Sequence, residues 1–324
     1  MEPELLKRLH IGRAALEIAL VPICLPVYLL LLWIFLTKRD FKTLIVYKLI
    51  VSLGLMDCLY LLQNLTNGLL TIFASNLLVN NVFPKDGFLG VFIKVISSFR
   101  IGHYITVPLL TFVLAVNRFT VMFNRKSCVL GPNVYKVAIT VAWILYATLV
   151  LALQYFDSGI VSGINSAGFF YNGPLAFMTA VRFGGPILEL GAFSCTVGIV
   201  IIVLIRKRVF HANIKVTPLE LRLILQSLLI CVPISIVYMC GKVVGDLKEQ
   251  IPWWLYIFWH FIIASIPAVN LSVYVMFNPL AQRHMKQMFR EQQTRIFVFS
   301  RWSKDGNVKP ASSRTGIFAA TSKQ

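Results

Sequence analysis

The sequence predicts an all-α membrane protein, a bundle of seven transmembrane helices, and three observations support this fold class. Hydrophobic residues make up 57% of the 324 residues and charged residues only 14%, a balance that a soluble domain of this length does not sustain. Apolar runs long enough to cross a bilayer as helices recur along the chain. The bases that give the formal net charge of +18 lie in short segments between these runs, which argues against a nucleic-acid-binding face.

Seven apolar runs meet the length of roughly 20 residues that a helix needs to cross hydrocarbon. We expect residues 1–14 to form an extracellular N-terminus and residues 15–277 to form the seven-transmembrane domain. The second and third runs exceed a bilayer's thickness, so they should tilt or protrude. The runs cover residues 15–36, 44–73, 88–123, 136–156, 179–205, 219–243 and 253–277.

Basic residues gather in alternate loops, which predicts the orientation of the chain. The remaining loops carry few bases or balance them with acids, so the positive-inside rule places the N-terminus outside and the C-terminus in the cytoplasm. We therefore expect a multi-pass protein of the plasma membrane. The bases on the predicted inner side are Lys38, Arg39, Lys42, Arg125, Lys126, Arg206, Lys207, Arg208 and Lys215.

The segment after the last run alternates apolar and basic residues at helical spacing. Met285, Met288 and Phe289 alternate with Arg283 and Lys286, which predicts a cytoplasmic amphipathic helix over residues 278–299 lying on the inner leaflet. Residues 300–324 are rich in Ser, Gly, Lys and Thr, a composition typical of a disordered tail.

A short motif ends the third run. Asn117, Arg118 and Phe119 stand in the stretch LAVNRFTVMF and resemble a variant of the Asp-Arg-Tyr motif of rhodopsin-like G-protein-coupled receptors. The Asn-Arg form is common in the nematode serpentine chemoreceptors, and the stretch FKTLIVYKLIVSLGLMD at residues 41–57 resembles their Srv and Srt branches. This resemblance implies a receptor that binds an extracellular small molecule or peptide in an outer helical cavity and activates a heterotrimeric G protein. It implies no enzyme activity, cofactor or metal.

Other positions depart from the rhodopsin-like pattern. Ser97 and Ser98 stand where the third helix usually carries a Cys, and no Cys lies in residues 157–178. No Trp precedes Pro233 in the sixth run, and Ile precedes Pro267 in the seventh, where Asn is usual. Because prolines permit kinks, Pro233 and Pro267 remain candidate hinges for activation.

Two ionisable residues are candidates for the activation machinery. Asp57 lies near the middle of the second run, where an ionised carboxylate needs partners. It could belong to a sodium- or water-linked polar network that changes on activation, or it could be a protonated acid hydrogen-bonded between helices. Arg118 could bind helix carbonyls and then meet the G protein, or it could extend to lipid headgroups.

A second group of candidates lies toward the outer end of the third run. Arg100 precedes Arg118 by five helical turns, about 27 Å along the same face, so it could bind an anionic group of the ligand beside His103 and Tyr104. Alternatively, Arg100 pairs with Glu189 or with headgroups. The spacing of His103 and His260 favours isolated histidines over metal ligands.

A second function class remains open from the sequence. A small secondary transporter or a ligand-gated channel subunit would also use an intramembrane acid and proline-broken helices. The two halves of the chain show no repeat of the kind that many transporters carry. A channel with inverted seven-helix topology would have its N-terminus inside, which labelling of intact cells distinguishes.

Overall fold

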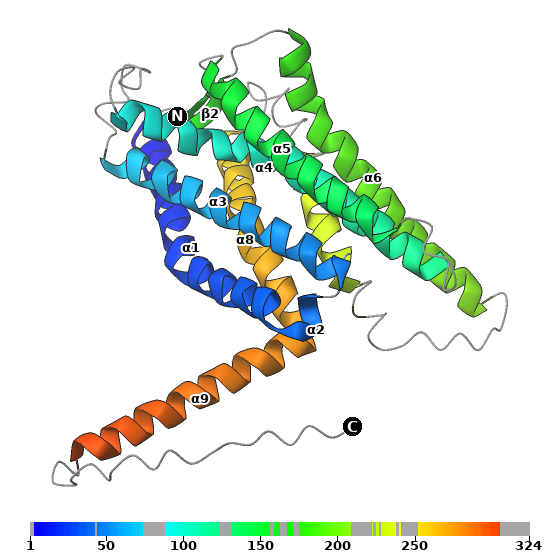
Figure 1. The fold of residues 1–324 in the computed structure, drawn as a ribbon. Coiled ribbons are helices and arrows are strands. Elements are labelled where there is room, and N and C mark those ends of the chain that lie inside the picture. The colour runs from blue at the N-terminus through cyan, green and yellow to red at the C-terminus, as the bar shows by residue number, and fades with distance from the viewer. Residues whose placement is uncertain are drawn as a thin grey trace. The chain divides into compact units, whose positions relative to one another are not determined.

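The computed structural model describes most of the membrane domain and the helix that follows it (Figure 1). Several residues discussed above lie outside this part of the chain, among them Arg125, Lys126, Lys215 and much of the predicted sixth run. The described residues are 3–42, 44–73, 88–123, 131–155, 159–162, 167–170, 175–208, 222, 225–226, 228–237, 240 and 252–304.

Six helices in the described residues are long and apolar enough to cross a membrane, which confirms a helical, multi-pass membrane architecture. A further apolar helix covers Leu228–Val237, inside the predicted sixth run, but is shorter than a bilayer requires. A seventh crossing therefore stays a prediction. The six long helices are α1 (Pro3–Thr37), α3 (Ile45–Phe73), α4 (Phe88–Phe123), α5 (Pro132–Tyr155), α6 (Leu175–Arg208) and α8 (Trp253–Phe277). A short helix, α2 (Arg39–Lys42), joins α1 to α3.

Helix α1 begins well before the expected start of the first run. It starts at Pro3, and its apolar span begins at His10. Arg13 and Glu17 are 2% exposed, and His10 is 3% exposed, so these polar residues lie inside the bundle. In a hydropathy profile, buried polar residues such as these look the same as a polar segment outside the membrane. This explains why the predicted run began later than the helix does.

A short β-hairpin, which the sequence analysis did not predict, lies between α5 and α6. Strand β1 (Gly159–Ser162) pairs antiparallel with β2 (Ala167–Phe170), with Gly159 opposite Phe170. Strand β1 contacts α3 and α4. The pairing satisfies backbone groups of this connection outside the helices.

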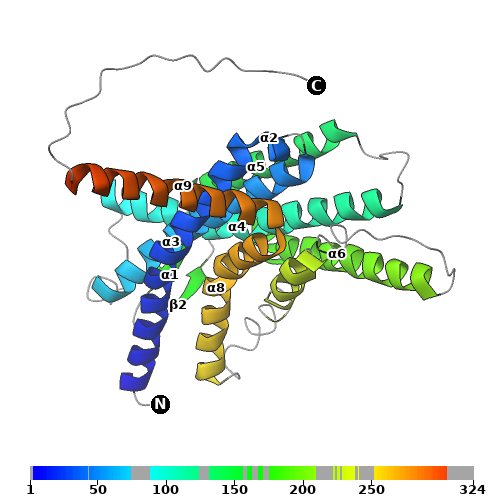
Figure 2. The same cartoon turned by 90° about the horizontal axis from the view of Figure 1, so that it is seen from below.

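Helices α3 and α4 form the middle of the described bundle. Helix α4 contacts α3, α5 and α6, while α1 contacts α3 and α8, an arrangement that Figures 1 and 2 show from two directions. More than half of the most apolar stretch of α3 and of α4 is buried inside the bundle, whereas only 22% of that of α5 is buried. Most of the surface of α5 therefore faces outward toward lipid. A lipid-facing surface must be apolar, which fits the apolar outer side chains of this helix.

Two glycines permit the closest helix contacts in this core. A Cβ atom at Gly102 of α4 would lie 2.7 Å from the ring of Tyr146 in α5. A Cβ atom at Gly68 of α3 would lie 2.8 Å from the carbonyl oxygen of Ala14 in α1. Small residues of this kind let helix backbones approach within a membrane, where packing drives helix association.

Many hydroxyl side chains in these helices donate to the backbone of their own helix one turn earlier. Thr71 donates to the carbonyl of Asn67 at 2.8 Å, and Thr106 to that of Gly102 at 2.6 Å. The same geometry occurs at Thr66, Ser98, Thr111, Ser194, Thr196, Ser265 and Ser272.

Helix α8 ends at an asparagine that also begins the next helix. Asn278 Oδ1 accepts the backbone N–H of Ala281 at 3.1 Å, which caps the start of α9 (Pro279–Lys304). Its Nδ2 donates to the Tyr47 hydroxyl at 3.5 Å. A second structural unit begins at Arg283; in it, α9 continues past the predicted helix end at residue 299 and is predominantly polar. Its predicted position on the membrane remains a prediction.

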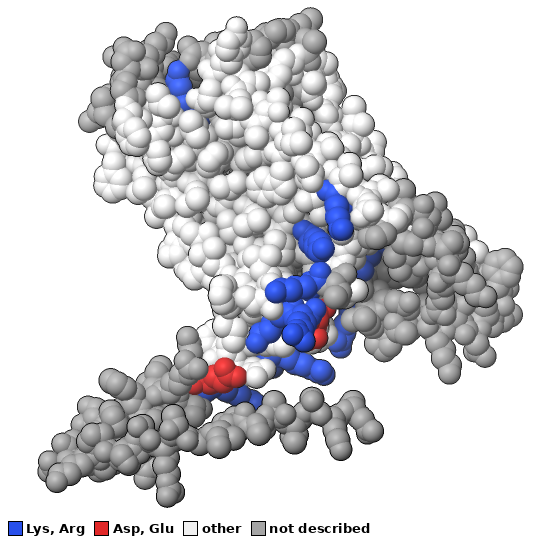
Figure 3. Space-filling model, in the orientation of Figure 1, with Lys and Arg blue, Asp and Glu red and all other residues white. Residues whose placement is uncertain are grey.

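Lys and Arg side chains gather toward one end of the bundle, beyond a large uncharged surface (Figure 3). Exposed bases near the α1–α2–α3 connection are Arg39, Lys42 and Lys48, and Lys136 is exposed near the start of α5. Thr120 of α4 contacts the Tyr135 hydroxyl at 3.2 Å, so the start of α5 lies beside the end of α4. Such an asymmetry is typical of a membrane protein with one strongly basic side.

Candidate functional site

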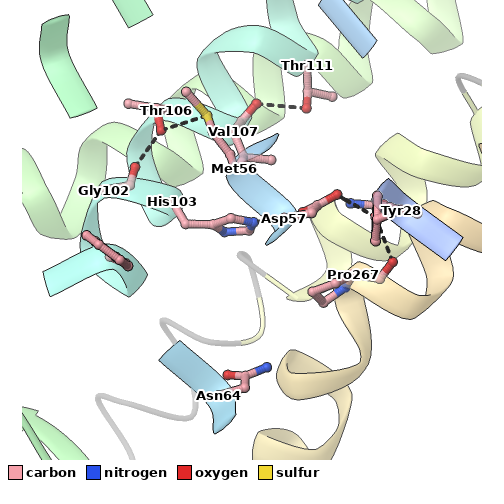
Figure 4. Close-up of polar contacts among 12 residues, drawn as sticks. Tyr28, Met56, Asp57, Asn64, Gly102, His103, Thr106, Val107, Thr111 and Pro267 are labelled. Atoms are coloured by element: carbon pink, nitrogen blue, oxygen red, sulfur yellow. Dashed lines mark hydrogen bonds and ion pairs between the residues drawn. The ribbon is translucent and has the colours of Figure 1, made fainter. Parts of the chain in front are cut away.

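A buried polar junction connects four helices at the middle of α3. Asp57 is 0% exposed, and three side chains contact its carboxyl group; Figure 4 labels two of them, Tyr28 and His103. Tyr28 of α1 and Asn270 of α8 approach Oδ2 at 2.8 and 3.1 Å, and His103 of α4 approaches Oδ1 at 3.0 Å. Both carboxyl oxygens thus have polar partners, as a buried acid requires.

The junction also includes backbone of α8. The Tyr28 hydroxyl lies 2.8 Å from the carbonyl oxygen of Pro267, and Tyr28 itself is 0% exposed. We call Tyr28, Asp57, His103, Asn270 and the Pro267 carbonyl the Asp57 junction. It joins the proline-containing segment of α8 to α1 and α3.

His103 is not the isolated histidine that the sequence favoured. Its ring stacks on that of Tyr60 with centroids 4.5 Å apart and an interplanar angle of 26°, while Nε2 contacts Asp57. The His-Asp pair does not extend to a metal site in the described part of the chain, where no group of three His, Cys, Asp or Glu residues could hold an ion. A direct role of His103 in ligand binding stays a prediction.

A second buried polar group, the Arg13 cluster, contains Arg13, Glu17, Asn67, Arg100 and His260. Arg13 Nε lies 3.7 Å from Glu17 Oε1, and Asn67 Nδ2 donates to Glu17 Oε2 at 2.6 Å. Arg100, 8% exposed, interacts electrostatically with Glu17 and His260. The cluster thus brings two guanidinium groups and a carboxylate together among α1, α3 and α4.

The acid near Arg100 is therefore Glu17, and the expected alternative of a pair with Glu189 is wrong. Glu189 of α6 instead accepts a hydrogen bond from Ser235 at 3.3 Å. Sequence reasoning missed Glu17 as a partner because spacing along the chain does not show which residues of the first and third runs meet. Tyr104 is half-buried and packs against an apolar cluster that includes Ile101 and Leu153.

The Asn117-Arg118-Phe119 motif lies near the basic end of α4. Arg118 is half-buried, and its Nε is buried without a hydrogen-bond partner among the described residues. Arg118 interacts electrostatically with Tyr47 at the start of α3. Asn117 is 2% exposed, whereas the Phe119 ring lies 3.7 Å from the Cβ position of Gly198 in α6.

The two candidate hinge prolines, Pro233 and Pro267, lie within helices, as do Pro108 and Pro186. Pro108, Pro186 and Pro267 fall inside α4, α6 and α8, and Pro233 falls inside the Leu228–Val237 helix. Of these, Pro267 has a direct contact with the Asp57 junction through its carbonyl. A role of Pro233 and Pro267 as hinges stays a prediction.

Sequence reasoning identified Asp57 but missed Tyr28 and Asn270. Both are polar residues in the middle of apolar runs, and that signal is visible in the sequence. Which helix faces they occupy became clear only with the packing of α1 and α8 against α3.

No protein-family model and no curated protein matches this chain. Its residues and their contacts are therefore the basis for any function assigned to it.

Proposed function

We propose that the chain is a G-protein-coupled receptor of the chemosensory kind. In this proposal it has seven crossings, with the Leu228–Val237 helix as part of the sixth, an outer N-terminus and a cytoplasmic C-terminus. It binds a small molecule or peptide from outside and activates a heterotrimeric G protein. Ligand binding shifts a two-state equilibrium toward a conformation whose inner mouth is open.

Arg118 is the observation that carries this proposal. Its guanidinium lies near the basic end of the bundle, and its buried Nε has no hydrogen-bond partner among the described residues. A guanidinium binds carbonyl and carboxylate groups well, so a partner that enters between the helix ends would meet a donor already in place. The exposed bases around it favour the anionic inner leaflet and an acidic partner surface.

The two polar groups supply the other parts of a receptor. The Arg13 cluster places Arg100 where a ligand carboxylate could compete with Glu17 for its guanidinium. The Asp57 junction lies between helices that must move relative to one another on activation, and its contacts reach α8 at Pro267. Buried polar contacts of this kind have discrete alternative pairings, which a two-state equilibrium requires.

Nucleotide exchange on purified G-protein heterotrimers tests the coupling role of Arg118. We reconstitute the chain in phospholipid vesicles and measure GTP-analogue binding to added heterotrimers, comparing the wild type with Arg118→Ala. The matched control is Arg39→Ala, which removes an exposed base near the basic end. We expect exchange above the empty-vesicle rate for the wild type and the control, and the empty-vesicle rate for Arg118→Ala. Equal exchange in both variants, or none with any heterotrimer class, contradicts the proposal.

A panel of small carboxylic acids and their methyl esters tests the ligand role of Arg100. Loss of a charge-assisted hydrogen bond should raise the half-maximal concentration of active acids by roughly 10- to 100-fold in Arg100→Gln. Active esters should be unaffected. A uniform loss for acids and esters, with normal surface expression, would show that Arg100 acts through the structure of the bundle and not through the ligand.

An epitope tag at each terminus tests the topology and the competing channel class. The proposal requires antibody binding to the N-terminal tag in intact cells and to the C-terminal tag only after permeabilisation. The reverse pattern would favour a channel of inverted topology.

A further inference from the structure

The Tyr28 hydroxyl contacts two oxygen atoms, and its single proton cannot serve both contacts. The hydroxyl lies 2.8 Å from Asp57 Oδ2 and 2.8 Å from the Pro267 carbonyl oxygen. A phenol has one proton and can donate to only one of these oxygens. Two oxygens that approach this closely without a proton between them repel each other. Both contacts are hydrogen bonds only when the second proton resides on Asp57.

The remaining contacts determine which carboxyl oxygen carries that proton. His103 Nε2 lies 3.0 Å from Oδ1, so Oδ1 accepts from an Nε2–H imidazole. Oδ2 then holds the proton and donates it to Tyr28, and Tyr28 donates to Pro267. Asn270 donates its amide N–H to Oδ2 at 3.1 Å. In this arrangement each polar contact of the junction is a hydrogen bond.

We propose that the Asp57 junction is a proton-binding site that couples its own protonation to α8. Loss of one proton from Asp57 Oδ2 to water leaves a carboxylate, and the Tyr28 hydroxyl then turns to donate to Oδ2. The Pro267 carbonyl then loses its hydrogen bond from Tyr28, so one of the contacts between α1 and α8 is broken. Rebinding of the proton restores the contact.

Other ionisable groups around the junction modulate this site without replacing it. From α3 they are Cys58 and Tyr60, from α8 Tyr274, and from the Leu228–Val237 helix Cys231, each of which interacts electrostatically with Asp57 or with a neighbour of Asp57. The charged residues Arg13, Glu17 and Arg100 act on Tyr60, which stacks on His103. Asp57 and His103 are in contact, and the Tyr28 geometry places the proton of this pair on Asp57.

This inference goes beyond receptor function and does not depend on G-protein coupling, because it concerns the isolated protein. Infrared difference spectra of the purified full chain in nanodiscs report protonated carboxyl groups directly through their C=O stretch. We expect such a band at acidic pH, its loss as the pH rises, and its absence in Asp57→Asn at every pH. Glu189→Gln is the matched control, because it removes another fully buried acid of the bundle and should leave the Asp57 band in place.

A fluorophore on α8 tests the coupling. Met276 is 67% exposed, and an environment-sensitive dye can be attached to Met276→Cys in a background where Cys128, Cys195 and Cys240 are Ser. The emission of the wild-type background should shift with pH over the range in which the infrared band disappears. Asp57→Asn, whose amide can donate to Tyr28 and accept from His103, should keep the acidic-pH emission throughout. Tyr28→Phe should still titrate in the infrared, at a shifted band frequency, but show no pH-dependent emission.

Clear outcomes would overturn the proposal. The site is absent if a folded wild type shows no carboxyl band that Asp57→Asn removes and Glu189→Gln keeps. The coupling is absent if Asp57→Asn or Tyr28→Phe retains the pH-dependent emission. Should Asp57→Asn fail to fold, the frequency shift in Tyr28→Phe still decides, since an unshifted band would show that the acid does not donate to Tyr28.

Discussion

Two buried carboxyl groups of this bundle are equally hidden but differently supported. Asp57 and Glu189 are both 0% exposed. Asp57 has partners from three other helices on both oxygens. Glu189 accepts one 3.3 Å hydrogen bond from Ser235, and its Oε2 has no partner among the described residues. Burial alone therefore does not show what an intramembrane acid contributes, whereas its set of partners does.

The difference follows from where the two acids lie. Asp57 lies in α3, and 56% of the most apolar stretch of that helix is buried inside the bundle. Glu189 lies in α6, where the corresponding share is 28%. An acid in the middle of the bundle can reach several helices at once. We therefore expect stability to depend strongly on Asp57 and weakly on Glu189, and three pairs of variants test this contrast.

Removal of each acid should give the largest difference. Asp57→Leu leaves the polar groups of Tyr28, His103 and Asn270 without their common partner and should lower the free energy of unfolding by about 3 kcal/mol or more. Glu189→Leu removes an incompletely bonded carboxyl group and should change it by about 1 kcal/mol or less. Heating with a thiol-reactive dye measures both, since Cys24, Cys58 and Cys231 are buried until the bundle opens. Equal losses would remove the contrast.

The packing of the helices that carry the two acids should differ in the same direction. Gly68→Ala in α3 places a methyl group against the backbone of Ala14 and should cost about 1–3 kcal/mol. At Gly184 in α6, an added methyl group meets no other atom within 4 Å among the described residues, so Gly184→Ala should be neutral or stabilising by up to about 1 kcal/mol, because alanine favours helix. The same melting assay applies. A costly Gly184→Ala would mean that the two regions are packed with similar density.

The partners of the two acids should show the smallest effects. Asn270→Ala removes a 3.1 Å donor from Asp57 and should cost about 1–2 kcal/mol. Ser235→Ala removes the 3.3 Å donor from Glu189 and should cost about 0.5 kcal/mol. If Ser235→Ala is the more damaging in parallel melts, hydrogen bonding does not explain the difference between the acids.

The sequence predicted the membrane helices better than the contacts between them. Five of the six long helices lie where apolar length placed them, since hydrocarbon-length runs have few alternatives to a helix. The start of α1 was missed because His10 and Arg13 are polar but buried inside the bundle, and a hydropathy profile does not show burial.

The candidate site was predicted in part. Asp57 was identified from its position in an apolar run, which a single helix reveals. The contact of His103 with Asp57 was not predicted, because the relative depth of α3 and α4 depends on how they pack, and its ligand role stays a prediction. For Arg100, a pair with Glu189 of α6 was one alternative to ligand binding, and its acidic neighbour is Glu17 of α1. Pairing between helices requires their rotation and offset, which residue spacing within one helix does not contain.

The serines and threonines that donate to their own helices have a consequence for reading membrane sequences. Such a side chain satisfies its own donor and can face a neighbour or a lipid tail without an external acceptor. The number of hydroxyl residues in an apolar run therefore overstates how many cross-links hold the bundle together. In the Asp57 junction and the Arg13 cluster, amide, imidazole, phenol and carboxyl groups form the hydrogen bonds between helices. A search for such bonds in other membrane sequences should start with those groups.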